Sequence, residues 1–289
     1  MNNKFNSRSS RHHYLPVFYL KGFLNRNKKF YIFDVEQQTF KKNSKEFSPK
    51  SYFFENNANT VFLDSKESDF LEFFHSKLDN MASKIFSIME KSTANNRYGI
   101  SEVDIPVLKL FISQVHGRLP ESKKVIQEFL RIHGLKEFGI IMNNDKDGER
   151  ENGLSGNNEF QKGLSLMMAF RNFYLGTQSN LPYSISSYSS DCPKMISDNP
   201  IIFKSSDSSN IWKEDLVFPL TGTKLFIASK NQNQQSLSFK FLADLIMFKQ
   251  ARKHVGFSDT LYLYELQKMN DKLSLSIEEL KKYFFTQLN

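Results

Sequence analysis

The chain has 289 residues, 39% of them hydrophobic and 24% charged, which is the composition of a globular protein with an extensive core. Its single cysteine, Cys192, excludes an internal disulfide and any site built from several thiolates. The most apolar runs are short, and the run 241–248 is interrupted by Asp244. We therefore expect a cytoplasmic protein with no membrane-spanning segment.

The positive charge is concentrated at the beginning of the chain. Residues 1–50 contain eight Lys and three Arg but only three acidic residues, so they carry the whole formal excess of +8. Lysines with aromatic residues between them favour a nucleic-acid-binding surface, because the rings can stack on bases. A basic segment that only aids solubility is the alternative. The residues that we expect to contact nucleic acid are Lys21, Arg26, Lys28, Lys29, Lys41 and Lys42.

The first third of the chain predicts a short helix followed by a hairpin. Residues 1–12 are expected to form a disordered lead. Pro16 is suited to the first position of a helix that continues to Leu24, with apolar residues on one face. Residues 29–34 and 38–42 flank a polar turn and predict an antiparallel hairpin, closed by a short strand or turn at 51–55.

The middle of the chain predicts helices and the later part predicts strands. Apolar residues at intervals of three and four indicate helices at 67–91, 101–115, 121–133 and 160–175. The polar, Gly-containing residues 143–158 predict a surface insert. Its acidic front half lacks the final Glu of a calcium loop, since Leu154 stands at that position, so calcium is excluded.

Beyond residue 181, short apolar runs indicate strands at 183–188, 195–197, 201–204, 216–220, 224–229 and 260–266. Helices are expected at 236–254 and 277–288. Together these elements predict a single α+β domain over residues 13–289: an N-terminal helix and β-hairpin, a helical middle, and a β-rich later half with closing helices.

Four polar residues are candidates for chemistry. His13 can act as a base, acid or ligand near neutral pH, or it can be a histidine that completes the packing of aromatic residues. Gln114 and Arg118 lie four apart on one helix, a spacing that suits phosphate recognition or a simple helix-end pair. Asp198, in the segment Ser-Asp-Asn-Pro, can be an acid, base or metal ligand, or a turn-forming residue.

Three blocks of the sequence resemble a bacterial family of uncharacterised proteins, DUF4238. The first is His13-Tyr14-Leu15-Pro16 followed by Phe18, Tyr19, Leu20 and Phe23; the second is Gln114, Arg118 and Pro120; the third is residues 197–200 followed by 218–221. His116-Gly117 departs from the bulkier apolar residues of the family pattern. The resemblance implies no activity, but widely separated polar residues in apolar blocks are expected to pair, so we expect the four candidates to converge on one pocket.

Two functions follow as expectations. The first is an enzyme that processes nucleic acid or nucleotides, most simply a nuclease-like effector of a bacterial defence or mobile-element system, with His13 as acid or base and Arg118 neutralising the phosphate. In this function Gln114 positions the substrate, and Asp198 orients His13 or holds a Mg²⁺ ion. No protein motif for a metal is present, so any metal is left to experiment. The alternative is a non-catalytic binding module for nucleic acid or protein, in which the same four residues form a buried structural network.

Overall fold

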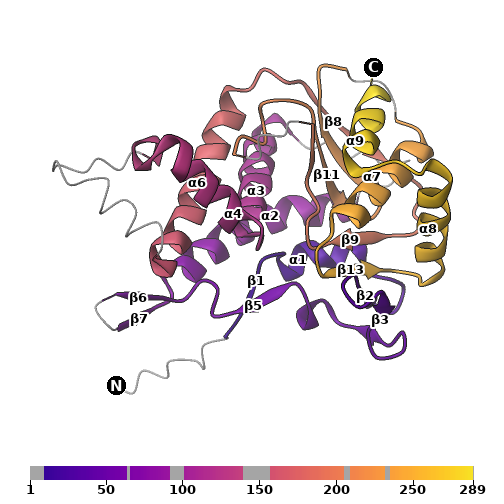
Figure 1. Ribbon diagram of the computed structural model, residues 1–289, viewed down its shortest axis with the longest axis horizontal. Coiled ribbons are helices and arrows are strands. Elements are labelled where there is room, and N and C mark those ends of the chain that lie inside the picture. Colours follow the sequence, from indigo (N-terminus) through magenta and orange to yellow (C-terminus); the bar gives the residue numbers. More distant parts are fainter. Residues whose placement is uncertain are drawn as a thin grey trace.

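The computed structural model describes residues 10–63, 66–91, 101–138, 157–204, 209–231 and 235–288 (Figure 1). These residues form a mixed α+β fold, as expected, with antiparallel sheets between two groups of helices (Figure 1). Residues 1–9 of the expected lead and 143–156 of the expected insert lie outside the described ranges.

The chain becomes ordered earlier than expected. β1 (Arg11–His13) pairs antiparallel with β5 (Phe54–Asn56), so residues 10–12 belong to the structure and not to a disordered lead. The predicted N-terminal helix is a single turn, α1 (Val17–Leu20), continued by the 3₁₀ turn η1 (Lys21–Phe23). A second 3₁₀ turn, η2 (Pro49–Ser51), precedes β5.

A five-stranded sheet joins both ends of the chain. The expected hairpin is present as β2 (Phe30–Asp34) and β3 (Thr39–Phe40), and β4 (Glu46–Phe47) also pairs with β2. On its other edge β2 pairs with β13 (His254–Phe257), which in turn pairs with β9 (Met195–Ser197). β13 was not predicted. A helix was expected to reach residue 254, but α7 ends at Gln250 and the chain continues into the strand.

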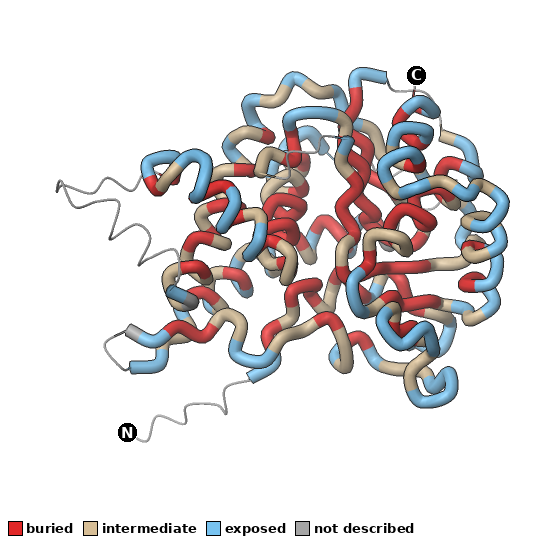
Figure 2. Tube along the Cα trace, in the orientation of Figure 1, coloured by how far each residue is buried: buried red, intermediate tan, exposed pale blue. Residues whose placement is uncertain are grey.

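A four-stranded sheet lies between two hydrophobic cores, and the strands predicted for it are confirmed. Its order is β10 (Ile202–Phe203), β11 (Leu216–Thr221), β12 (Lys224–Ala228) and β8 (Tyr183–Ser187). Along β11 the residues alternate: Phe218 packs into the core beneath α1, while Val217 packs into the core formed with the C-terminal helices. Both faces of this sheet are therefore covered, which explains why β11 is buried throughout (Figure 2).

Two groups of helices cover the sheets (Figure 1). The first group is α2 (Phe70–Lys91), η3 (Glu102–Asp104), α3 (Ile105–Arg118), α4 (Ser122–His133), η4 (Leu135–Phe138) and α6 (Asn158–Gln178). A hairpin that was not predicted, β6 (Val61–Leu63) with β7 (Lys66–Ser68), precedes α2. The second group is α7 (Leu237–Gln250), α8 (Leu261–Leu273) and α9 (Ile277–Thr286).

The strand predicted at 260–266 is wrong, because this segment is the start of α8. Its buried residues are Tyr262, Leu263 and Leu266, whereas Leu261 and Tyr264 are exposed. Leu266 follows Leu263 by three residues and Tyr262 by four, which is the spacing of one helix face. The aromatic residues of this segment favoured a strand and concealed that spacing.

The N-terminal motif is part of the core. Tyr19 is fully buried, its ring stacks on Phe218 with centroids 5.4 Å apart, and its hydroxyl donates to the Pro219 carbonyl at 2.7 Å. Gly22 lies against the same strand, since a Cβ there would come within 3.1 Å of the Thr221 side chain. The first and third blocks of the family resemblance therefore meet through packing.

Candidate functional site

Arg118 is the centre of a polar network between β1, α2 and α3. Its Nη1 donates to both carboxylate oxygens of Asp79, at 2.9 and 3.1 Å, and its Nη2 donates to the His13 carbonyl at 2.5 Å. The Arg118 side chain is only 5% exposed, so these bonds form away from bulk water. Arg118 thus ties the first strand to two helices that come much later in the chain.

Gln114 lies one helical turn before Arg118 and is fully buried. Its Nε2 lies 3.1 Å from Nδ1 of His75 and 3.4 Å from the His75 carbonyl oxygen. Burial, together with the positive charge of Arg118, holds the pKa of His75 well below its ordinary value, so this imidazole is neutral. Burial also raises the pKa of Asp79, against the lowering effect of its bonds to Arg118 and Gln114.

His13 presents its imidazole to the same region. The ring packs against Phe54 with centroids 5.5 Å apart, and it contacts the backbone of Lys50. Burial lowers the pKa of His13, and the hydrogen bond to Lys50 opposes this while the charge of Arg118 adds to it. His13 is therefore uncharged at neutral pH. Its neighbour His12 is buried and accepts a bond from the Asn59 amide at 2.8 Å.

We call the set His13, His75, Asp79, Gln114 and Arg118 the Arg118 network. Three of its buried atoms have no hydrogen-bond partner among the described residues: Nε2 of His13, Oε1 of Gln114 and Nε of Arg118. Buried polar atoms are nearly always hydrogen-bonded, so three in one network mark a place where a bound group would find partners.

Asp198 is engaged elsewhere. It follows β9, is 6% exposed, and its carboxylate accepts bonds from the backbone amides of Arg252, Lys253 and His254 at 2.8 to 2.9 Å. These bonds lower its pKa, but burial outweighs them and raises it. Asp198 therefore stabilises the connection between α7 and β13. The structure brings His13, Gln114 and Arg118 together and supplies Asp79 where the sequence had suggested Asp198.

His75 and Asp79 were missed by sequence reasoning. Both lie on α2, four residues apart, among polar residues that resemble an ordinary solvated helix face. The available signal was indirect: a guanidinium within an apolar block requires a carboxylate, and the sequence offers many.

The predicted nucleic-acid-binding residues are at the surface. Lys21, Arg26, Lys28, Lys29 and Lys42 are exposed, and none of them forms an ion pair within the described ranges. Lys41 differs, because it pairs with Asp34 and its Nζ donates to Gln37 at 3.0 Å, which closes the turn of the hairpin.

The aromatic residues of this basic segment do not form a stacking surface. Phe23, Phe30 and Phe33 are at most 2% exposed and belong to the cores, whereas Tyr31 is half-buried and donates to Glu46 at 3.3 Å. Phe30 and Phe33 lie on opposite faces of β2, and each face is covered by a hydrophobic core. Any contact with nucleic acid would therefore be made chiefly by the lysine and arginine side chains.

Neither a metal site nor a membrane segment is found in the described part of the chain. Within it, no three His, Cys, Asp or Glu side chains are grouped so that they could hold a metal ion. The expected involvement of Mg²⁺ stays a prediction for experiment. Among the same residues, the helices are too short or too polar to span a bilayer.

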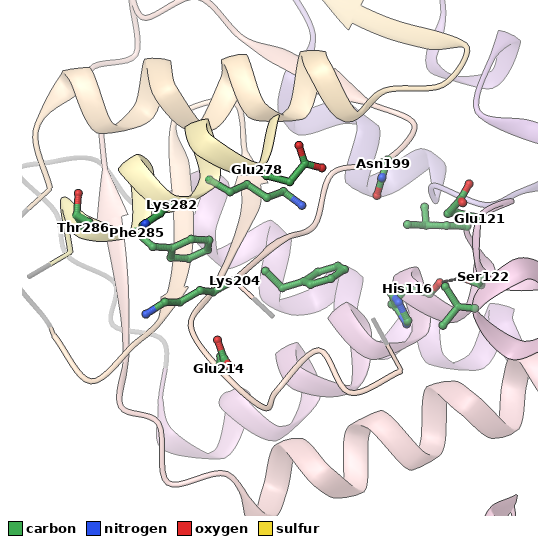
Figure 3. A pocket seen from close by; sticks show the side chains of 14 residues that line it. His116, Glu121, Ser122, Asn199, Lys204, Glu214, Glu278, Lys282, Phe285 and Thr286 are labelled. Atoms are coloured by element: carbon green, nitrogen blue, oxygen red, sulfur yellow. Dashed lines mark hydrogen bonds between the residues drawn. The ribbon is translucent and has the colours of Figure 1, made fainter. Parts of the chain in front are cut away.

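A pocket of about 810 Å³ lies on the other side of α3 (Figure 3). Glu278, Lys282, Phe285 and Thr286 of α9 form one side, and His116, Glu121 and Ser122 form the opposite side (Figure 3). This pocket could not be predicted from the sequence, because its lining comes from distant segments without a shared motif.

Comparison with known protein families identifies a match over most of the chain. The family model described as "Protein of unknown function (DUF4238)" matches residues 11–241, which include the whole Arg118 network. No curated protein and no solved structure matches the chain significantly.

Proposed function

The chain belongs to the DUF4238 family, and from that premise we propose that it is an enzyme that cleaves phosphodiester bonds, with its active site at the Arg118 network. The observation that carries the proposal is the group of three unpartnered buried atoms on His13, Gln114 and Arg118. An imidazole, an amide and a guanidinium are the groups that phosphoryl chemistry uses for proton transfer, positioning and charge neutralisation.

His13 is the general base of the proposal. Its lowered pKa leaves the ring uncharged at neutral pH, and its Nε2 is unpartnered among the described residues. Nε2 would take the proton from an attacking water or ribose hydroxyl as the new bond to phosphorus forms. The bond to the leaving oxygen then breaks, and solvent protonates that oxygen.

Arg118 and Asp79 act as a pair in this scheme. Asp79 holds the guanidinium through Nη1, which leaves Nε of Arg118 to donate to a phosphate oxygen. Oε1 of Gln114 would accept a hydrogen bond donated by a hydroxyl of the substrate. Asp79 therefore orients Arg118, which differs from the role expected of Asp198, namely to orient His13 or to hold a Mg²⁺ ion.

The exposed Lys21, Arg26, Lys28, Lys29 and Lys42 support a polyanionic substrate. They extend from η1 into the hairpin and its following turn, and a surface charge of one sign attracts nucleic acid independently of its sequence. The larger proposal of a nuclease-like effector in bacterial defence rests on this charge and on the network together.

The test is cleavage of end-labelled tRNA, single-stranded DNA and duplex DNA by the purified full chain, with Mg²⁺ or with EDTA. We expect at least one substrate to be cut by the wild type and by His133→Ala, which removes an exposed histidine outside the network. His13→Ala should abolish the cutting. Equal cutting by His13→Ala and His133→Ala would refute the assignment, and the EDTA lanes decide whether metal takes part.

A second candidate is a non-catalytic nucleic-acid-binding module. It is favoured by the structural bonds of Arg118, which connects β1 to α2 and α3, and by the full engagement of Asp198. In this case no substrate is cut, but a gel shift detects binding that Lys28→Glu with Lys29→Glu removes. Replacing Lys268 and Lys272, exposed on α8, with Glu is the matched control for charge.

A further inference from the structure

The pocket on the far side of α3 has the size and wall of a small-molecule site. Its volume of about 810 Å³ is within the range of about 300 to 1,000 Å³ that such sites occupy. Apolar surface comes from Leu119, directly after α3, and from Val125 of α4, Phe203 of β10 and Phe285 of α9. The pocket is therefore able to hold a compact ligand with an apolar or planar body.

Most charged groups around the pocket are exposed or already paired. Glu121 pairs with Arg252, and Lys204 lies 3.5 Å from Asp215 with its side chain half exposed. Glu214 and Glu278 are exposed at the opening. Lys282 is exposed as well, so the charges around the pocket are of mixed sign and do not form the one-sign surface that attracts a nucleic-acid chain.

Lys281 is different from these groups. It is partly buried, and its Nζ lies 5.2 Å from the centroid of the Phe203 ring. Within the described ranges it forms neither an ion pair nor a hydrogen bond, and burial lowers its pKa despite the nearby charge of Glu278. A partly desolvated ammonium whose nearby opposite charge, Glu278, is exposed to solvent is only weakly compensated, and an anionic ligand would offset that cost.

His116 adds an uncharged donor. It is 4% exposed, burial lowers its pKa to about 4, and its ring meets Phe203 edge-on at 6.4 Å. Nδ1 of His116 lies 3.3 Å from the side-chain nitrogen of Asn172, and with that amide as the donor the proton of the neutral ring is on Nε2. The lining therefore places the partly buried ammonium of Lys281 beside a neutral imidazole and an aromatic ring.

We propose that this pocket binds a small organic anion, whose carboxylate or phosphate pairs with Lys281 and whose apolar body lies against Phe203 and Leu119. The site is separate from the Arg118 network. Gln114 and Arg118 project from α3 toward α2, whereas His116 projects toward α6, so the two sites lie on opposite faces of one helix. The proposal goes beyond the proposed cleavage activity and does not depend on it.

The test is calorimetric titration of the full chain with adenosine 5′-monophosphate, benzoate and inorganic phosphate. We expect an organic anion to bind at least about tenfold more tightly than inorganic phosphate, which lacks an apolar body. The nucleotide and benzoate distinguish a phosphate from a carboxylate ligand. Failure of both organic probes to bind would overturn the proposal, whatever the cleavage assay shows.

Two variants assign the binding to Lys281. Lys281→Gln should weaken binding by about tenfold or more, because it removes a charge-assisted bond. Lys272→Gln, a change at an exposed lysine on α8, should leave binding unchanged. Equal affinities for these two variants would overturn the role of Lys281.

Amine labelling gives a measurement on the wild type that does not depend on how the variants fold. Trace acetylation followed by peptide mapping should show that the bound anion protects Lys281 but not Lys272. Equal labelling of Lys281 with and without the anion would also overturn the proposal.

Discussion

We predict that the buried ion pair between Arg118 and Asp79 is the strongest interaction that holds the Arg118 network together. The proposed perturbation is a double-mutant cycle of Arg118→Met and Asp79→Leu, which remove each charge while keeping much of the side-chain volume. Arg118→Met leaves the Asp79 carboxylate, 20% exposed, without its cation and the His13 carbonyl without its donor.

The magnitude follows from burial. Two unit charges about 4 Å apart attract by about 4 kcal/mol at an effective dielectric constant of about 20, and desolvation offsets part of this. We therefore expect Arg118→Met to lower the free energy of unfolding by about 3 kcal/mol, with a coupling between the two residues of about 2 kcal/mol.

Urea unfolding of the wild type, both single variants and the double variant measures the coupling. The control is the pair Arg131 and Glu128 on α4, which has a similar two-bond geometry but is 70% and 57% exposed. Its coupling should be near zero. If the two pairs gave the same coupling, burial would not be what makes the Arg118 bond strong, and the reasoning would be refuted.

Three further predictions use the same unfolding measurement. His116 has a pKa of about 4 in the folded chain and an ordinary value of 6.5, so the unfolded chain binds the proton first as the pH falls. Stability should therefore fall between pH 6.5 and about 4, by up to roughly 3 kcal/mol, and equal losses in wild type and His116→Gln would contradict this. Gly117→Ala should lower the free energy of unfolding by about 2 kcal/mol, because its Cβ would lie 2.6 Å from the Ser165 carbonyl oxygen. Gly163→Ala, with open space around it, should stabilise α6 by about 0.5 to 1 kcal/mol. Equal effects of the two variants would exclude close helix packing as the cause. Asp198→Asn should cost about 2 kcal/mol but retain any cleavage activity per folded molecule, and a specific loss of rate would restore Asp198 to the active site.

The reason for a glycine at position 117 is found in the tertiary structure. α6 comes so near α3 that a Cβ at residue 117 would meet the Ser165 carbonyl. A pattern of residue types along one helix carries no information about the distance to another helix, so this reason required the tertiary structure.

The core face of α2 illustrates a partial success. Apolar spacing correctly predicted a helix over most of 67–91, but the apolar residues Phe70, Met81 and Ile88 on this helix are 58%, 47% and 42% exposed. The helix instead buries residues such as Phe86 and Met89. Apolar residues occur on more than one side of this helix, so the period was evident while the direction of burial was not.

The sequence by itself determined the α+β class, most helices and strands, the N-terminal hairpin and the polar residues His13, Gln114 and Arg118. Local spacing and turn chemistry are sufficient for these features, because they depend on neighbours along the chain. Only the tertiary structure decided that Asp79 and not Asp198 meets Arg118, that the aromatic rings of the basic segment are buried, and that a pocket forms beside α9. Each of these depends on which distant elements pack together. That packing decides how strong a buried hydrogen bond is and which polar atoms remain without a partner.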